Sequence, residues 1–238
     1  MIKLKDILLE STAPDIFIPR RIEGRVERLI RLYVKNGSKG NLSLNKVGLT
    51  KLPDILKDIT VGESFDCSYN NLTSLEGSPS SVGGNFGCGF NNLTSLEGAP
   101  KTVGGNFDCS GNNLTSLEGA PKTVGGTFGC GVNNLTSLEG SPSSVGGNFD
   151  CYNNNLTSLE GAPSSVGEDF SCNDNHLTSL TGAPKTVGRN FDCSYNYLIS
   201  LAGAPKIVDK DFHCRNNTVQ LTKEQVRAVC DVKGKIYV

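Results

Sequence analysis

Apolar positions return along this chain with a period of 21 residues. Each unit reads Phe-x-Cys-x-x-Asn-x-Leu-x-x-Leu, first at Phe65 and for the last time, in part, at Phe212. A fixed period in the twenties predicts a solenoid, in which each unit buries its apolar side by stacking on its neighbours. The period-two spacing of Phe and Cys predicts a short strand with both side chains inward.

Strands from successive units are expected to pair into a parallel sheet with a spacing of about 4.7 to 4.9 Å. The two Leu fill the core after the chain turns, and Gly77 with Pro79, or their equivalents, bends it back on the convex side. Extended or 3₁₀ segments and little helix are expected there. The predicted fold class is therefore an α/β repeat solenoid that is mainly β.

The unit that begins at Phe86, with Cys88 and Asn91, resembles the leucine-rich repeat core L-x-L-x-x-N-x-L-x-x-L. Phe and Cys take the first two Leu places, and the resemblance covers about residues 41–220. It is similar to the short bacterial class of these repeats, with Gly-Ala-Pro or Gly-Ser-Pro in the back turn. The resemblance implies a concave parallel sheet and an asparagine ladder. The Val-Gly-Gly that precedes each strand lies one place away from the position where these repeats usually carry a leading Leu.

Both ends of the chain depart from the repeat. Residues 1–19 predict an amphipathic segment, helical from 3 to 10, and a linker; residues 20–40 predict a helical cap whose face includes Ile22, Val26, Leu29 and Tyr33. The solenoid is assigned to 41–219. Residues 220–238 predict a C-terminal cap, with a capping box at Thr222 that opens a short helix and a terminal strand that hides the last sheet edge.

Charge is distributed unevenly behind a net charge of −1. Residues 65–204 hold 4 Lys or Arg against 12 Asp or Glu, whereas both flanking segments are basic. An acidic array argues against nucleic acid as a partner of the repeat face. No apolar run is long enough to span a membrane, and no signal-peptide h-region forms at the N-terminus. These features predict a cytoplasmic protein that does not bind membranes.

Two repeated columns suggest chemistry but are interpreted as structural. The Cys column has no C-x-x-C pair and predicts small buried hydrophobes, with disulfides between rungs or a metal stack as the alternatives. The Asn column predicts buried amides that bond the backbone of adjoining turns. The Cys members are Cys67, Cys88, Cys109, Cys130, Cys151, Cys172, Cys193 and Cys214. The Asn members are Asn70, Asn91, Asn112, Asn133, Asn154, Asn175 and Asn196.

Catalysis has no support in the sequence. His176 and His213 lie in different columns without a nucleophile partner, and Val-Gly-Gly-Asn lacks the Lys-Ser/Thr of a phosphate loop. No catalytic residue, metal ligand or cofactor is predicted.

Recognition is predicted where the outward positions of the repeats are acidic or differ from one another. The Asp column alternates with Gly at successive repeats, which spaces its charges. Three roles are open for this column: a solvated acidic face, a surface for a basic partner, or a calcium site. Consecutive carboxylates do not converge as a calcium site requires. The candidate partner-binding residues are Asp66, Tyr69, Phe90, Asp108, Val132, Asp150, Tyr152, Asp192, Tyr195 and Tyr197.

The predicted function is a non-enzymatic protein-binding module whose concave or acidic face recognises a macromolecule, most simply another protein. Residues Met1 to Glu10 resemble the short capsid-targeting leader of internal proteins in myovirus-type bacteriophages, because Leu8-Leu9-Glu10 fits the Leu/Ile-x-Glu cleavage motif. That resemblance implies phage origin and gives an alternative, a virion component in which the solenoid is a spacer. The protein is expected to be a monomer or a weak oligomer through its ends.

Overall fold

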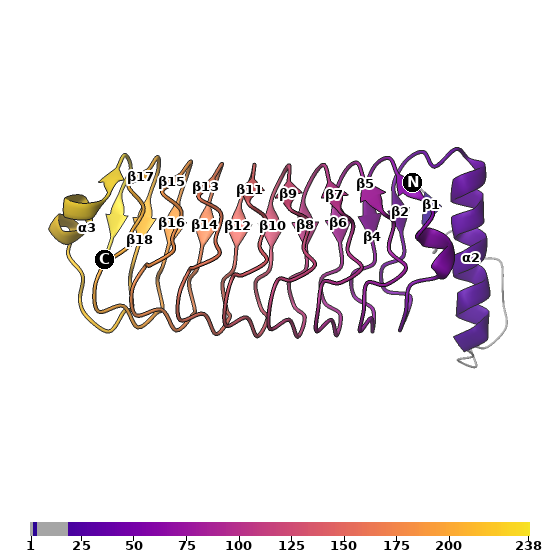
Figure 1. Cartoon of the computed structure of the whole chain (residues 1–238), viewed down its shortest axis with the longest axis horizontal. Helices are drawn as coiled ribbons and strands as arrows, with labels where there is room; N and C mark the ends of the chain where they lie inside the picture. The colour runs from indigo at the N-terminus through magenta and orange to yellow at the C-terminus, as the bar shows by residue number, and fades with distance from the viewer. Residues whose placement is uncertain (1, 4–18) are drawn as a thin grey trace.

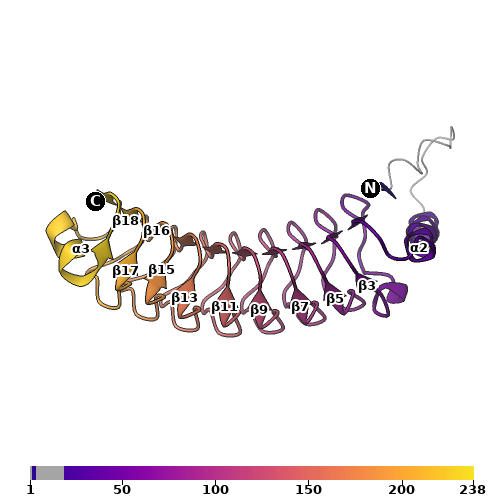
Figure 2. The same ribbon diagram turned by 90° about the horizontal axis from the view of Figure 1, so that it is seen from above.

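Two-residue parallel strands line two sides of the molecule, whose computed structural model describes residues 2–3 and 19–238. Eight strands that begin at the repeated Phe, with β1, β2 and β20 at the two ends, form an eleven-stranded sheet on the concave side (Figures 1 and 2). This concave sheet comprises β1 (Ile2–Lys3), β2 (Leu42–Ser43), β4 (Phe65–Asp66), β6 (Phe86–Gly87), β8 (Phe107–Asp108), β10 (Phe128–Gly129), β12 (Phe149–Asp150), β14 (Phe170–Ser171), β16 (Phe191–Asp192), β18 (Phe212–His213) and β20 (Ile236–Tyr237). The predicted repeat solenoid and its concave sheet are confirmed.

The convex side carries a second parallel sheet where only extended or 3₁₀ segments were expected. Its nine strands are β3 (Thr60–Val61), β5 (Ser81–Val82), β7 (Thr102–Val103), β9 (Thr123–Val124), β11 (Ser144–Val145), β13 (Ser165–Val166), β15 (Thr186–Val187), β17 (Ile207–Val208) and β19 (Asp231–Val232). In the first eight of these strands the Val is buried and the preceding Ser, Thr or Ile faces solvent more, whereas in β19 Val232 is only partly buried and follows Asp231. In the sequence a polar residue precedes each Val except Val208, as in a strand with one buried face, but a strand of only two residues is too short to identify from this pattern.

The Val-Gly-Gly motif follows from how closely these convex turns approach. A Cβ added to Gly83 would lie 2.2 Å from the carbonyl oxygen of Gly62, and one on Gly104 would lie 2.1 Å from that of Gly83. Any side chain at the first Gly would therefore collide with the backbone of the preceding turn. This contact explains why the first of the two positions is Gly from Gly83 to Gly188; Asp209 takes that place in the last unit.

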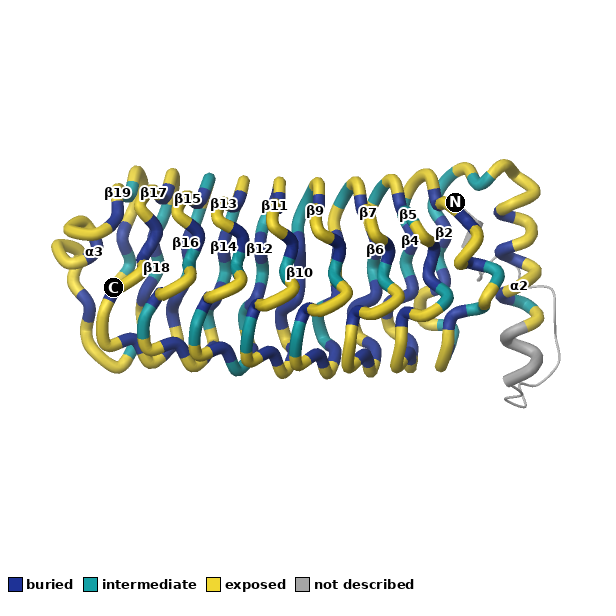
Figure 3. Tube along the Cα trace, in the orientation of Figure 1, coloured by how far each residue is buried: buried dark blue, intermediate teal, exposed yellow. Residues whose placement is uncertain are grey.

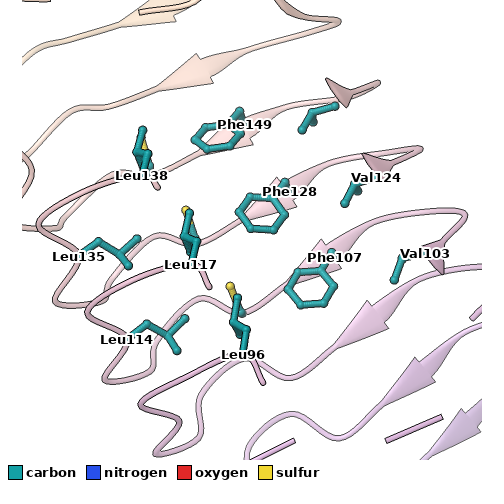
Figure 4. Packing of buried hydrophobic residues seen from close by; sticks show 14 of the residues in the cluster. Leu96, Val103, Phe107, Leu114, Leu117, Val124, Phe128, Leu135, Leu138 and Phe149 are labelled. Carbon is teal, nitrogen blue, oxygen red and sulfur yellow. The ribbon is translucent and has the colours of Figure 1, made fainter. Parts of the chain in front are cut away.

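Between the sheets lies a linear core made of identical side chains. Successive Phe rings from Phe65 to Phe212 have centroids 5.1 to 5.6 Å apart and are fully buried. Figure 4 shows Phe107 and Phe128 between the Val of the convex sheet and the Leu of the opposite turn. Each unit thus buries its apolar side on the next, as the period predicts.

A buried asparagine amide joins every pair of turns. The Oδ1 of Asn133 accepts from the backbone N–H of Leu114 at 3.1 Å, and its Nδ2 donates to the carbonyls of Cys109 and Cys130 at 3.2 and 3.1 Å. Asn70 through Asn196 repeat this geometry, and Asn217 completes it at a half-buried position. The predicted asparagine ladder is confirmed.

A second side-chain ladder occupies the position just before each Phe. Its oxygens accept the backbone N–H of the equivalent residue one turn later: Asn85 accepts from Asn106 at 2.8 Å, and Asn106 accepts from Thr127 at 2.8 Å. Ser64, Thr127 and Asp169 continue it with different side chains. Only the acceptor oxygen is common to them, so residue identity did not reveal this ladder.

Helix α2 (Pro19–Lys35) covers the N-terminal end of the core, as predicted (Figure 1). Val26, Leu29 and Tyr33 are buried, and so is Ile30, whereas the side chain of Ile22 lies outside the described residues. The helix ends with Gly37 at a φ of 73°. A 3₁₀ turn, η1 (Asp54–Leu56), follows in the first, irregular repeat.

The C-terminal cap contains helix α3 (Lys223–Val229), opened by the predicted capping box between Thr222 and Gln225. Two expectations are corrected here. By the 21-residue period Thr222 takes the last Leu place of the repeat, but it is exposed, and Leu221 is buried there instead. The expected single terminal strand is divided between β19 in the convex sheet and β20 in the concave sheet, because the chain crosses between sheets at Lys233 and Gly234.

The predicted leader and linker lie almost wholly outside the described residues, which omit Met1 and residues 4–18. Ile2 and Lys3 form β1 beside β2, so Lys3 lies in a strand and does not begin the expected helix. No helix among residues 19–238 has both the length and the apolar character needed to cross a bilayer.

We expect Asn133→Asp to lower the free energy of unfolding by about 3 to 5 kcal/mol, because a buried carboxylate would face two carbonyl oxygens without a donor. Asn134→Asp is the matched control, since Asn134 is exposed, and should change stability by about 0.5 kcal/mol or less. Urea unfolding followed by circular dichroism measures both. Equal midpoints would contradict the structural role of the amide.

Candidate functional site

The outward column of the concave sheet alternates aspartate with small residues. Asp66, Asp108 and Asp192 each accept a hydrogen bond at 2.9 to 3.0 Å from the backbone N–H of the Ser two residues later. These bonds hold the carboxylates against their own strands, on the face that the sequence analysis assigned to them. Pairing of β4, β6 and β8 places one glycine between the first two aspartates.

Glycine in this column makes space for the neighbouring carboxylate. A Cβ added to Gly87 would lie 3.1 Å from Oδ1 of Asp66, and one on Gly129 would lie 3.2 Å from Oδ1 of Asp108. Both distances are tighter than ordinary van der Waals contact. Glycine thus leaves room for the carboxylates of Asp66 and Asp108, whereas Ser171 and His213 take the same place beside Asp150 and Asp192.

Asp150 differs from the other members of the column. Tyr152 stands in the place of the usual Ser, and its ring lies over Gly131, where an added Cβ would meet the ring at 2.7 Å. Burial raises the pKa of the half-buried Asp150 carboxyl to about 6. A hydrogen bond with the Ser171 side chain opposes this rise, and the charges of Asp169 and Asp108 add to it. Burial, followed by the charge of Asp150, also raises the pKa of Tyr152. This part of the face is a partly covered acidic site.

The residue three places after the end of each concave strand from β2 to β18 has a left-handed backbone, and we call these residues the left-handed column. All nine members have φ between 52° and 68°. They are Lys46, Tyr69, Phe90, Gly111, Val132, Asn153, Asp174, Tyr195 and Asn216. The column includes Tyr69, Phe90, Val132 and Tyr195, four of the partner-binding residues proposed from the sequence.

Five of these nine residues do not suit a left-handed backbone. Gly, Asn and Asp adopt it readily, whereas a β-branched or bulky side chain there costs about 1 to 2 kcal/mol. Val132, Phe90 and Tyr195 are nonetheless placed there, with side chains 39%, 48% and 57% exposed. They gain little from burial, so the requirements of the fold do not account for them.

Stacking recovers part of that cost at the N-terminal end of the column. The rings of Tyr69 and Phe90 lie 4.6 Å apart at 7°, and the Nζ of Lys46 lies 4.6 Å from the centre of the Tyr69 ring. Gly111 is next, and an added Cβ there would meet the Phe90 ring at 2.8 Å. An aromatic pair contributes about 0.5 to 1.5 kcal/mol, which is less than the cost of two strained residues. Lys46, Tyr69 and Phe90 thus form an exposed cluster of one cation and two stacked rings.

A second aromatic cluster lies toward the C-terminal end. The ring of Tyr197 stacks on His176 at 5.6 Å, and Tyr195 belongs to the left-handed column two residues before it. Tyr195 and Tyr197 are 57% and 55% exposed. Of the predicted aromatic residues, Tyr69 and Phe90 therefore lie toward one end of the array and Tyr195 and Tyr197 toward the other, with Tyr152 between them, so they do not form one patch.

Three features of the site were not identified from the sequence. Lys46 precedes the regular repeats, so its membership of the left-handed column was not evident. Gly111 and Gly131 have no side chain and gave no sign of a role in the sequence, but they leave room for the rings of Phe90 and Tyr152, respectively. Ser68 follows the inward Cys67 and should face outward by the period-two spacing of a strand, yet it is buried at 9% exposure. Figure 3 shows exposed segments in the turns that follow the concave strands.

The cysteine column forms no reactive site. All nine cysteines are free thiols and buried. Burial raises the pKa of Cys109 and Cys130 well above the usual value, and it raises those of Cys214 and Cys230 to about 11. A thiol that stays protonated at neutral pH is a poor nucleophile and metal ligand. In the described part of the chain, no three His, Cys, Asp or Glu side chains gather to hold a metal ion.

No protein-family model matches the chain, and no curated protein matches it either. Among solved structures, the chain is similar to YopM from Yersinia enterocolitica WA-314, with 21% sequence identity and a TM-score of 0.43. The similarity covers 98% of this chain and 62% of YopM, so the chain spans less than two thirds of that protein. The fold described above therefore rests on strand order and ladder geometry.

We expect the stability conferred by Asp150 to fall as pH rises from about 4 to about 6, because the folded state holds this proton more tightly than the unfolded chain. Asp150→Asn should therefore raise the free energy of unfolding at pH 7 by about 1 to 2 kcal/mol, with solvent screening included, and have little effect at pH 4. Urea titrations at both pH values, with Asp192→Asn as the control, measure this. A pH-independent difference would contradict it.

Val132→Asn should stabilise the protein by about 1 kcal/mol, because Asn adopts a left-handed backbone at less cost than a β-branched residue. The reverse change, Asn153→Val, at the next position of the column should destabilise it by a similar amount. Thermal unfolding of the two variants provides the measurement. A loss of stability in Val132→Asn would show that the Val side chain has a packing role.

Proposed function

We propose that this protein is a non-enzymatic protein-binding module whose partner contacts the concave face and the left-handed column. One observation carries the proposal: large apolar side chains are exposed on a backbone that disfavours them. Strained positions persist where the surrounding structure holds them, and they cluster at binding sites. Solenoids of this kind present extended concave surfaces for binding.

The chemistry of the two surfaces indicates what the partner presents. Tyr69 and Phe90 offer rigid aromatic area at one end of the column, and aromatic residues contribute disproportionately to interface energy. Asp66 ends β4, the concave strand that precedes Tyr69 in the chain, and Asp108 lies two strands further along the sheet. A partner with an apolar group beside one or more basic side chains would complement both features.

Acidic charge also bears on which partners are favoured. The repeats hold three times as many acidic as basic residues, and phosphate-rich partners need clustered Lys and Arg. A protein partner therefore suits this face better than a nucleic acid. The half-buried carboxyl of Asp150, with a pKa of about 6, would bind a cation more strongly above that pH than below it.

The double variant Tyr69→Asn/Phe90→Asn separates function from stability. Because Asn suits the left-handed backbone, the variant should keep or raise its melting temperature while losing tenfold or more in partner affinity. Ile199→Asn is the matched control, since Ile199 is 64% exposed and lies outside the column. Capture from an extract of the source organism, quantified by mass spectrometry against wild type, is the measurement.

A partner that the wild type and Ile199→Asn capture equally, and the double variant does not, would support the proposal. Equal capture by all three proteins would instead favour the alternative in which the solenoid is a spacer and its ends make the contacts.

A further inference from the structure

Two rows of polar side chains repeat along one side of the solenoid, in the turns that follow the concave strands. In each of these turns an Asn and a Thr stand on either side of a fully buried Leu. We call this surface the Asn–Thr face. All its members are exposed except the half-buried Asn155. The Asn row is Asn71, Asn92, Asn113, Asn134 and Asn155, and the Thr row is Thr73, Thr94, Thr115, Thr136, Thr157 and Thr178.

The fold does not account for the identity of these side chains. None of them forms a side-chain hydrogen bond with a described residue, whereas the Ser that follows each Thr has a structural role. The hydroxyl of Ser95, for example, accepts from the backbone N–H of Glu97 at 3.0 Å. Exposed residues without such a role are free to change, and the left-handed column, two residues before the Asn row, changes from each unit to the next. Rows that stay constant beside it indicate a ligand that meets every unit in the same way.

The backbone holds the two rows at a regular spacing. The N–H of Asn113 donates to the carbonyl of Leu93 at 2.8 Å, and this bond recurs from turn to turn. Where the Asn row continues as His176 and Tyr197, the two ring centroids lie 5.6 Å apart. In Figure 1 the turns that follow the concave strands end along a straight line, and the bend of the solenoid is seen only in Figure 2. A linear ligand can therefore follow the rows and keep the same contacts at every turn.

Charge on this side of the molecule selects against an anionic ligand. The five segments from 70–77 to 154–161 contain no Lys or Arg, and each has one Glu three residues after its Thr. The ion pair in the described part of the chain joins Lys233 to Asp231, so no described cation pairs with these glutamates. A negatively charged chain laid along the rows would be repelled. Neutral hydroxyl groups suit the face, because amide and hydroxyl side chains both donate and accept, and carboxylates accept.

We propose that the Asn–Thr face binds a neutral, extended polysaccharide with β-1,4-linked sugars, such as a glucan or a polymer of N-acetylglucosamine. Such a chain presents the same hydroxyl groups at a constant interval, and its advance per sugar is close to the spacing of the turns. It lies along the rows with a sugar beside each turn, hydrogen-bonded by the Asn amides and the Thr hydroxyls. Tyr197, 55% exposed, contacts the sugar at the C-terminal end of the Asn row. This site is separate from the left-handed column and from the protein partner assigned to it.

Rows of Asn and Thr can also serve only to keep the solenoid solvated, or they can meet another surface with the same repeat. Ice and a second copy of this chain are the two surfaces of that kind. A solvated face binds no polymer, and neither ice nor a second copy needs a sugar.

The experiment measures retention of the full chain on amorphous cellulose and on chitin beads at increasing protein concentration. Starch, whose α-linked chains are helical, and a polygalacturonate gel, which is anionic, are the counterparts. Wild type should bind cellulose or chitin and neither counterpart, and the two positive arms distinguish the sugar. Salt should change this binding little, because the ligand carries no charge.

A four-residue variant removes the hydrogen-bonding groups from the middle of the face. Asn113→Ala/Thr115→Ala/Asn134→Ala/Thr136→Ala should weaken binding about tenfold or more, because four exposed side chains lose their contacts with the sugar. Thermal unfolding followed by circular dichroism checks that the variant is folded.

Thr102→Ala/Thr123→Ala is the matched control, since these Thr are exposed on the convex strands β7 and β9. It should bind as wild type does. Tyr197→Ala should weaken binding about threefold to tenfold through the lost contact of its ring. The double variant Tyr69→Asn/Phe90→Asn should keep polysaccharide binding, which separates this face from the left-handed column.

Equal binding by wild type and the four-residue variant overturns the proposal, and so does equal retention on starch or polygalacturonate. Absence of binding to cellulose and chitin also overturns it. Dimerisation in sedimentation velocity, or inhibition of ice recrystallisation, that the four-residue variant abolishes would then assign the face to a second copy or to ice. Because Tyr197 lies outside the four substituted positions, Tyr197→Ala gives a result even if the four-residue variant folds poorly.

Discussion

A buried amide that must be fully hydrogen-bonded is the constraint on which this structure depends. Burial of Phe and Leu is favourable but nondirectional, so the apolar columns alone do not fix how one turn sits on the next. Each ladder asparagine has backbone partners in two adjacent turns, and an unmet partner in this interior would be costly. The amides thereby set the register in which the rings, thiols and both sheets align.

That register explains why some positions repeat and others vary. Where a side chain touches its own copy one turn away, as the Phe rings and the paired glycines of the convex turns do, every unit must satisfy the same contact. Some exposed positions form a second class and differ between repeats, even where two of their side chains meet, as those of Tyr69 and Phe90 do. The left-handed column belongs to the second class, although its backbone is as uniform as that of the core.

The sequence predicted the columns of Phe, Cys, Asn and Leu because each is buried for a reason that residue type reveals. It did not predict the convex sheet, whose strands are two residues long, or the second ladder, whose members share an oxygen and no other property. The left-handed backbone was also missed, since Val132 and Tyr195 are residues that propensity places in extended strands. Lys46 escaped notice because the repeat around it is irregular. Variability did mark Tyr69 and Phe90, but their stacking could be seen only in three dimensions.

The two ladders also determine how the molecule can change in length. Each unit accepts from one neighbour and donates to the other through the same groups, so any unit can stand beside any other without a new side chain. Unequal recombination between two 21-residue copies would add or remove a whole turn and leave every core contact intact. Only the order of residues in the left-handed column and the aspartate column would show that a repeat had been added or lost. The spacing between the two aromatic clusters is therefore a quantity that a single genetic step can alter by one turn at a time.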